Sequence, residues 1–164
     1  MDKRKLTHLD DAGAARMVDV GDKPTTRRTA VAQALCRMQN ETAETIRGGS
    51  TKKGDVLQIA RIAAIGAAKR TDELIPLCHS LPLDSVEVQF DWPDVALLRI
   101  RVTATCTGRT GVEMEALVAA SLAALTVYDM CKAIDRSMRI ESVELVEKSG
   151  GVHGDFKKSD AKND

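Results

Sequence analysis

Aromatic residues are scarce in this chain, at 2% of its 164 residues. Proteins that bind single-stranded nucleic acid stack its bases on aromatic rings, so this composition argues against that class. The charges point the same way, because 24 Lys and Arg balance 24 Asp and Glu and leave no global field toward nucleic acid or a membrane surface. A chain of this length fits one domain, whose core must be built from Ala, Val, Leu and Ile.

The chain also lacks the cysteine patterns of metal centres. Its four cysteines are widely separated, without a CxxC pair or zinc-type spacing, and its three histidines are scattered. We therefore expect no structural metal site and no resident cofactor. Since the start of the chain does not read as a signal peptide, we expect reduced thiols, a cytoplasmic location and no membrane partner.

Uncharged runs are short, and the longest lies within residues 110–136. Residues 116–128 carry no charge and no polar face, which predicts a helix buried on most sides. The uncharged part spans roughly 20 Å, less than a membrane-crossing helix of about 20 apolar residues requires. We expect this helix to pack against a sheet and against another subunit.

The remaining pattern predicts an α+β fold. Residues 25–38 favour a strand, although 30–37 could also be helical, and residues 71–83 read as irregular. A single domain is expected over 1–151, with order ending at Gly150–Gly151 and a polar, partly disordered tail over 152–164. The order of elements favours an antiparallel sheet of the split βαβ type, covered by helices. The other predicted elements are strands at 15–20, 85–92, 97–107 and 138–148, a helix at 41–47 capped by Asn40, and a helix at 56–69 capped by Asp55.

Two loops carry residues suited to chemistry. Lys52 and Lys53 precede Gly54 and a helix N-terminus, where backbone N–H groups can meet a phosphate. Because the spacing is not that of a P-loop, spacing alone favours the alternative, a solvated basic loop. Between two prolines, Cys78 and His79 combine a thiol with a group that titrates near neutral pH. No partner acid is evident, so a buried cysteine beside a hydrogen-bonded histidine is the alternative. His8 and His153 are expected to be exposed and without a role.

The long helix has polar residues at both ends. Glu113 and Glu115 suit the helix dipole, and as ligands they can also accept from the N–H and NH₂ edge of a guanine-like ring. Asp129 and Lys132 share one helix face. Because they follow the uncharged run, we expect partial burial, which lowers a lysine pKa or raises a carboxylate pKa toward values useful for proton transfer.

The distance between the two ends of this helix leads to a further expectation. Met114 and Asp129 are fifteen residues apart, about 22 Å along a helix axis. They cannot both line one small pocket of the same subunit. A two-fold pairing of antiparallel helices would join the Met114 end of one subunit to the Asp129 end of the other.

Seven sequence blocks stand in order along the chain: ARMVDV (15–20), KGDV (53–56), AAKRT (67–71), LIPLCH (74–79), TGVEMEAL (110–117), ALTVYDMCKA (124–133) and EKSGG (147–151). Through these blocks the chain resembles the cyclic pyranopterin monophosphate synthases of molybdenum cofactor biosynthesis, the MoaC family. The family commonly has proline after LCH, whereas Ser80 stands here, which puts the local loop path in question.

The resemblance implies a ferredoxin-like fold and a homohexamer built as a trimer of dimers. It implies a phosphorus–oxygen lyase whose small-molecule substrate, 3′,8-cyclo-7,8-dihydroguanosine triphosphate, is made from GTP by a radical SAM enzyme. The products would be cyclic pyranopterin monophosphate and diphosphate, and Mg²⁺ could accompany the triphosphate. A non-catalytic nucleotide- or pterin-binding oligomer and a structural assembly protein are the alternatives.

The resemblance also assigns roles to residues. Asp129, Lys132 and Lys53 would be catalytic. The substrate-binding residues would be Leu77, Cys78, His79, Glu113, Met114, Glu115, Arg28 and Lys148.

Overall fold

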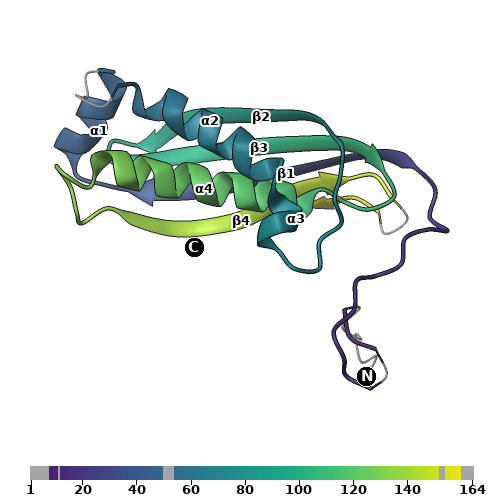
Figure 1. The fold of residues 1–164 in the computed structure, drawn as a ribbon. Coiled ribbons are helices and arrows are strands. Elements are labelled where there is room, and N and C mark those ends of the chain that lie inside the picture. Colours follow the sequence, from purple (N-terminus) through teal and green to yellow (C-terminus); the bar gives the residue numbers. More distant parts are fainter. Residues whose placement is uncertain (1–7, 11, 50–53, 152–153, 160–164) are drawn as a thin grey trace.

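The protein folds into one antiparallel sheet with helices packed on it (Figure 1). The computed structural model describes residues 8–10, 12–49, 54–151 and 154–159. The strands are β1 (Thr26–Arg37), β2 (Leu83–Asp94), β3 (Leu97–Gly108), β4 (Arg139–Ser149) and β5 (Phe156–Lys157). The helices are α1 (Asn40–Arg47), α2 (Val56–Ala68), α3 (Thr71–Leu74) and α4 (Glu113–Cys131). The strand order is β2-β3-β1-β4-β5, so the predicted α+β, ferredoxin-like fold is confirmed, as is the strand at 25–38.

The central strand β1 shows why the helices lie where they do. Its residues alternate between buried and half-exposed, and Ala30, Ala32 and Ala34 are fully buried. These small side chains face α4, which lies beside α2 over one face of the sheet (Figure 1). Alanines at Ala60 and Ala120 are also fully buried, so the backbones of the helices and the sheet approach closely.

The predicted long helix is α4. By length and composition alone it is the one helix of the described residues that could cross a membrane. Nine of its 19 residues are buried, and they pack on the sheet and on α2. This is the packing of a core helix, as the absence of a polar face predicted.

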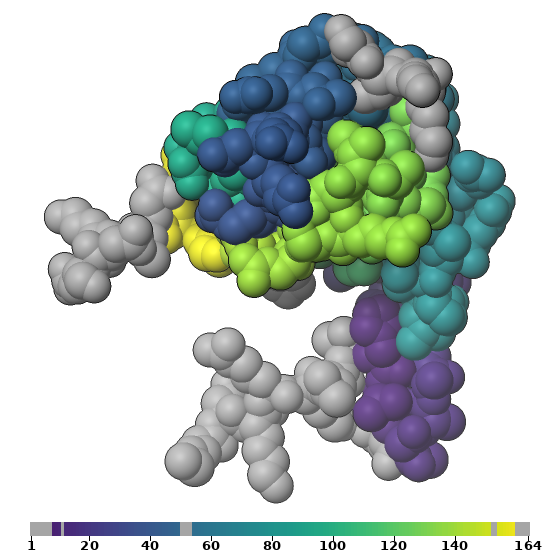
Figure 2. Space-filling view, turned by 90° about the vertical axis from the view of Figure 1, so that its left-hand side faces the viewer, coloured from purple at the N-terminus to yellow at the C-terminus, as the bar shows by residue number. Residues whose placement is uncertain are grey.

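The start of α1 is stabilised from a distant part of the chain. Asn40 is the first residue of α1 and not its cap, so that prediction is wrong, and the cap position, Gln39, makes no side-chain capping hydrogen bond. Instead Asp135, 1% exposed, accepts from the Gln39 backbone N–H at 2.8 Å and from the Thr42 hydroxyl at 3.3 Å. Figure 2 shows the dark blue atoms of α1 against the light green end of α4 and the loop that follows it. By contrast, Asp55 caps α2 as predicted, accepting from the N–H groups of Leu57 and Gln58.

The two ends of the chain differ from expectation. The strand predicted at 15–20 is absent, because the segment has no partner strand beyond an isolated bridge between Leu9 and Ala15. Alternation of polar and apolar residues cannot distinguish a paired strand from extended chain. The described residues before β1 instead form an arm that leaves the body of the molecule (Figure 1). Order does not end at Gly150–Gly151, since β5 pairs with β4 beyond them.

Candidate functional site

A cavity of about 480 Å³ opens where α4 begins. Its walls come from the N-terminal arm, the loop after α3, the turn after β3 and the first turn of α4. We call it the carboxylate pocket, because Glu113 and Glu115 line it. The lining residues are His8, Val18, Val20, Lys23, Leu77, Cys78, His79, Leu81, Thr110, Gly111, Glu113, Met114 and Glu115.

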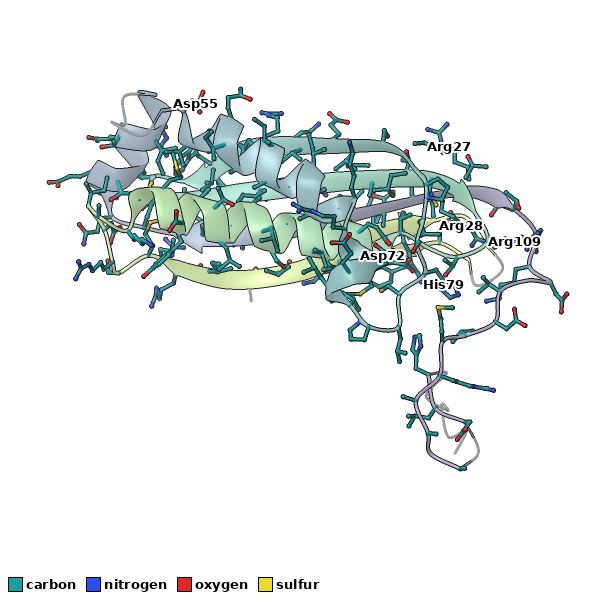
Figure 3. The ribbon with its side chains drawn as sticks, viewed as in Figure 1. Arg27, Arg28, Asp55, Asp72, His79 and Arg109 are labelled. Carbon is teal, nitrogen blue, oxygen red and sulfur yellow. The ribbon has the colours of Figure 1, made fainter. Side chains whose placement is uncertain are left out.

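A smaller cavity of about 150 Å³, the cationic pocket, adjoins the first. Four of its lining residues are Lys or Arg and one is a carboxylate. Figure 3 shows Arg28, Arg109 and His79 at the same end of the molecule, with Asp55 at the other. The two pockets share Lys23, Thr110, Gly111 and Glu113. The cationic pocket is lined by Lys23, Arg28, Thr29, Arg109, Thr110, Gly111, Glu113, Lys148, Ser149, Gly150 and Gly154.

Arg28 is a buried cation, only 7% exposed. Its Nε and Nη2 donate to the carbonyls of Gly108 and Arg109, both at a long 3.4 Å. The chain passes over it at Gly150 and Gly151, whose φ values are +87° and +94°. A Cβ on Gly151 would overlap the Arg28 guanidinium, so glycine is required for this close approach. Arg28 thus keeps donor capacity for an anion beside it.

The two acids at the start of α4 have different environments. Glu115 is 4% exposed, and burial, together with the negative charges of Glu113 and Asp72, raises its pKa to about 7. It can therefore take up or release a proton near neutral pH. Glu113 instead forms an ion pair with Lys148 of β4, at 2.9 Å between Oε1 and Nζ.

The loop after α3 is tied to the N-terminal arm. The backbone carbonyl of Val18 lies 2.8 Å from His79 Nε2, so this nitrogen carries the proton and donates. Burial, and then the charge of Glu115, raises the pKa of the Cys78 thiol. A raised pKa disfavours the thiolate, so Cys78 is poorly suited as a nucleophile. Ser80 donates a hydrogen bond to the Asp72 carboxylate of α3.

Asp129 and Lys132 lie at the opposite end of α4. They form an ion pair at 2.6 Å, and their side chains are 63% and 52% exposed in the single chain. The prediction of partial burial is wrong for one chain, because the last turns of α4 bury Val127 and Cys131 instead. Of the two predicted shifts, a lower lysine pKa or a higher carboxylate pKa, the first does not occur in the single chain, because the hydrogen bond and charge of Asp129 raise the pKa of Lys132.

The structure therefore brings together the predicted binding residues and keeps the predicted catalytic pair apart from them. Leu77, Cys78, His79, Met114 and Glu115 line the carboxylate pocket, Arg28 and Lys148 line the cationic pocket, and Glu113 lines both. Met114 and Asp129 belong to one continuous helix, about 22 Å apart along its axis. Lys53 and His153 lie outside the described residues.

Sequence reasoning missed several residues of the pockets. His8 is exposed as expected, but it lines the carboxylate pocket. Val18 and Val20 also line this pocket. Their block, ARMVDV, predicted a strand and gave no sign of a pocket wall. Lys23 and Arg109 flank the turns before β1 and after β3, and no local pattern marks them as neighbours.

Fold and site define an α+β protein with a carboxylate pocket and a cationic pocket that meet at the start of a core helix. The model of the MoaC family matches residues 17–151, and the chain belongs to this family.

Three relatives are each named cyclic pyranopterin monophosphate synthase. The protein of Herpetosiphon aurantiacus is 62% identical over 152 residues, covering 92% of this chain and 93% of the relative. That of Chloroflexus aurantiacus is 58% identical, covering 94% and 95%. That of Halalkalibacterium halodurans is 52% identical, covering 95% and 96%.

Proposed function

We propose that the protein is a cyclic pyranopterin monophosphate synthase of molybdenum cofactor biosynthesis. It converts 3′,8-cyclo-7,8-dihydroguanosine triphosphate to cyclic pyranopterin monophosphate and diphosphate. The observation that carries the proposal is the junction of the two pockets at Glu113, because this substrate joins a polyphosphate to a ring with an N–H and NH₂ edge.

Each half of the substrate has matching groups in the pockets. Phosphate oxygens accept charge-assisted hydrogen bonds from Arg28, Arg109 and Lys148 in the cationic pocket. The guanine-derived edge donates to the acids of the carboxylate pocket. Any Mg²⁺ that the reaction uses is expected to arrive with the triphosphate, whose oxygens are the hard ligands that it prefers.

The reaction needs proton transfers and charge neutralisation. Opening and rebuilding the purine-derived ring moves several protons, which Asp129, Lys132, Lys53 and Glu115 can transfer. Forming the cyclic phosphate breaks a phosphorus–oxygen bond and expels diphosphate, so the enzyme acts as a lyase. The cations of the pocket neutralise the charge that develops on the leaving diphosphate.

One chain does not contain the whole site. Asp129 and Lys132 lie too far from the carboxylate pocket to reach a substrate bound there. A two-fold dimer with antiparallel α4 helices places the pair of one subunit beside the pocket of the other. Three such dimers make the homohexamer, which works in the cytoplasm after the radical SAM enzyme that cyclises GTP.

The test is turnover of the cyclised GTP intermediate by the purified protein, followed by detection of the pterin product and of diphosphate. Asp129→Ala and Lys132→Ala are expected to lose activity. Unchanged activity in both variants refutes the assignment of catalytic residues. Binding of the intermediate without turnover favours the alternative, a non-catalytic nucleotide- or pterin-binding oligomer.

Complementation tests the shared site. Inactive Lys132→Ala and inactive Glu115→Ala subunits are unfolded together, mixed in equal amounts and refolded. A mixed dimer then carries both changes in one site and leaves the other intact, which restores about a quarter of wild-type activity. No recovery in a mixture that demonstrably contains mixed dimers refutes a site built from two subunits.

A further inference from the structure

The Glu113–Lys148 ion pair lies at the boundary of the two pockets. Glu113 lines both pockets, whereas Lys148 lines only the cationic one. One carboxylate oxygen is held by the lysine at 2.9 Å, and the carboxylate folds back over Gly111, where a Cβ would overlap it. The same acid is therefore engaged by a cation of one pocket while it borders the other.

This ion pair is weak enough for an anionic ligand to replace Glu113 as the partner of Lys148. The side chains of Lys148 and Glu113 are 36% and 28% exposed, and ion pairs with such access to water contribute little stability. A polyphosphate brings several negative charges and many acceptor oxygens, and its hydrogen bonds to ammonium and guanidinium groups are among the strong ones in proteins. Arg28 and Arg109 already face the place that it would occupy.

Repulsion between the polyphosphate and the Glu113 carboxylate also favours this replacement. Glu113 is the one carboxylate among the described lining residues of the cationic pocket. A polyphosphate in that pocket places like charge beside it, and like charges in a partly buried site repel. The ligand thus attracts the lysine and repels its partner.

We propose that the polyphosphate tail of the substrate takes Lys148 from Glu113 and thereby frees the Glu113 carboxylate to bind the N–H edge of the substrate ring. The inference rests on the proposed function and adds a basis for substrate selection to it. A nucleoside without phosphates meets a Glu113 that is still paired. The two halves of the substrate therefore strengthen each other's binding, and the ion pair selects for a polyphosphorylated ring.

Two simple probes separate the halves. Inorganic tripolyphosphate represents the tail and guanosine represents the ring, and the affinity of guanosine is measured by calorimetry with and without saturating tripolyphosphate. Ionic strength is held constant, because salt screens exposed charges. The gain cannot exceed the strength of the ion pair that is broken, so we expect tripolyphosphate to tighten guanosine binding by about two- to fivefold.

Variants identify the pair as the source of the coupling. In Lys148→Gln, Glu113 is free from the outset, so guanosine binds as tightly without tripolyphosphate as it does to the saturated wild type. In Glu113→Gln the carboxylate is absent, so guanosine binds weakly under both conditions. Arg109→Gln is the matched control: it removes a cation of the same pocket and weakens tripolyphosphate binding, but at saturation it keeps the wild-type coupling.

Several results overturn the exchange. They are unchanged or weaker guanosine binding with tripolyphosphate in the wild type, no binding of either probe, and wild-type coupling in Lys148→Gln or Glu113→Gln. Turnover of the cyclised intermediate is measured separately on the wild type. Turnover without coupling refutes the exchange alone, whereas coupling without turnover refutes the proposed function alone.

Discussion

Replacement of Glu115 by glutamine is expected to make the protein more stable at high pH. Burial raises the pKa of Glu115 from 4.5 to about 7. The folded protein therefore holds this proton more tightly than the unfolded chain does, and its stability falls as the pH rises from about 4.5 to about 7. A difference of about 2.5 pKa units corresponds to about 3 kcal/mol at pH 8. Glutamine keeps the shape of the side chain but cannot ionise, so the variant escapes this loss.

The assay is urea unfolding of the wild type and Glu115→Gln at intervals from pH 4 to pH 8. Protein concentration is fixed, because association changes apparent stability. The two free energies of unfolding are expected to converge near pH 4, where carboxyl and amide are both neutral, which provides an internal control. Above pH 7 the variant is expected to exceed the wild type by up to about 3 kcal/mol. A difference that stays constant with pH refutes the raised pKa of Glu115.

Three other substitutions test the packing around the site. Asp135→Ala removes the acceptor for Gln39, Thr42 and Ser137, and urea unfolding is expected to show a loss of about 1–3 kcal/mol, because the buried hydroxyl of Thr42 and two part-buried N–H groups lose their partner. Ala120→Leu overfills the buried side of α4 and is expected to lower the free energy of unfolding by about 1–3 kcal/mol, with unchanged stability indicating a looser core than described. Gly151→Ala displaces the buried guanidinium from the cationic pocket and is expected to raise KM for the cyclised intermediate in steady-state kinetics; an unchanged KM would show that this close approach does not shape the site.

The parts of the fold that sequence predicted are those that local pattern determines. The uncharged stretch of α4 indicates a helix buried on most sides, and the alternation of β2 and β3 indicates which side of each strand is buried. The same alternation misled at residues 15–20, because a strand also needs a partner and none of the described strands pairs there. The capping of α1 was missed because Asp135 is 96 residues from Gln39 in sequence.

The candidate site was predicted mainly through family resemblance. Residue types alone suggested Cys78–His79 and Glu113–Glu115 separately, and only the fold places them in one pocket. The pairing of Lys148 with Glu113 joins β4 to α4 and left no signal in the sequence. The uncharged run did not predict the exposure of Asp129 and Lys132. At this end of α4 the buried residues are Val127 and Cys131, which lie on another side of the helix.

The hydrogen bonds of Asp135 to the start of α1 have a consequence for folding. A helix of eight residues is too short to persist alone in water. Its stabilising carboxylate leaves the ribosome only after β2, β3 and α4 have been made. During synthesis from the N-terminus, α1 therefore becomes stable late, although it is the first helix of the chain. A truncated chain ending before Asp135 should therefore fail to form a stable α1.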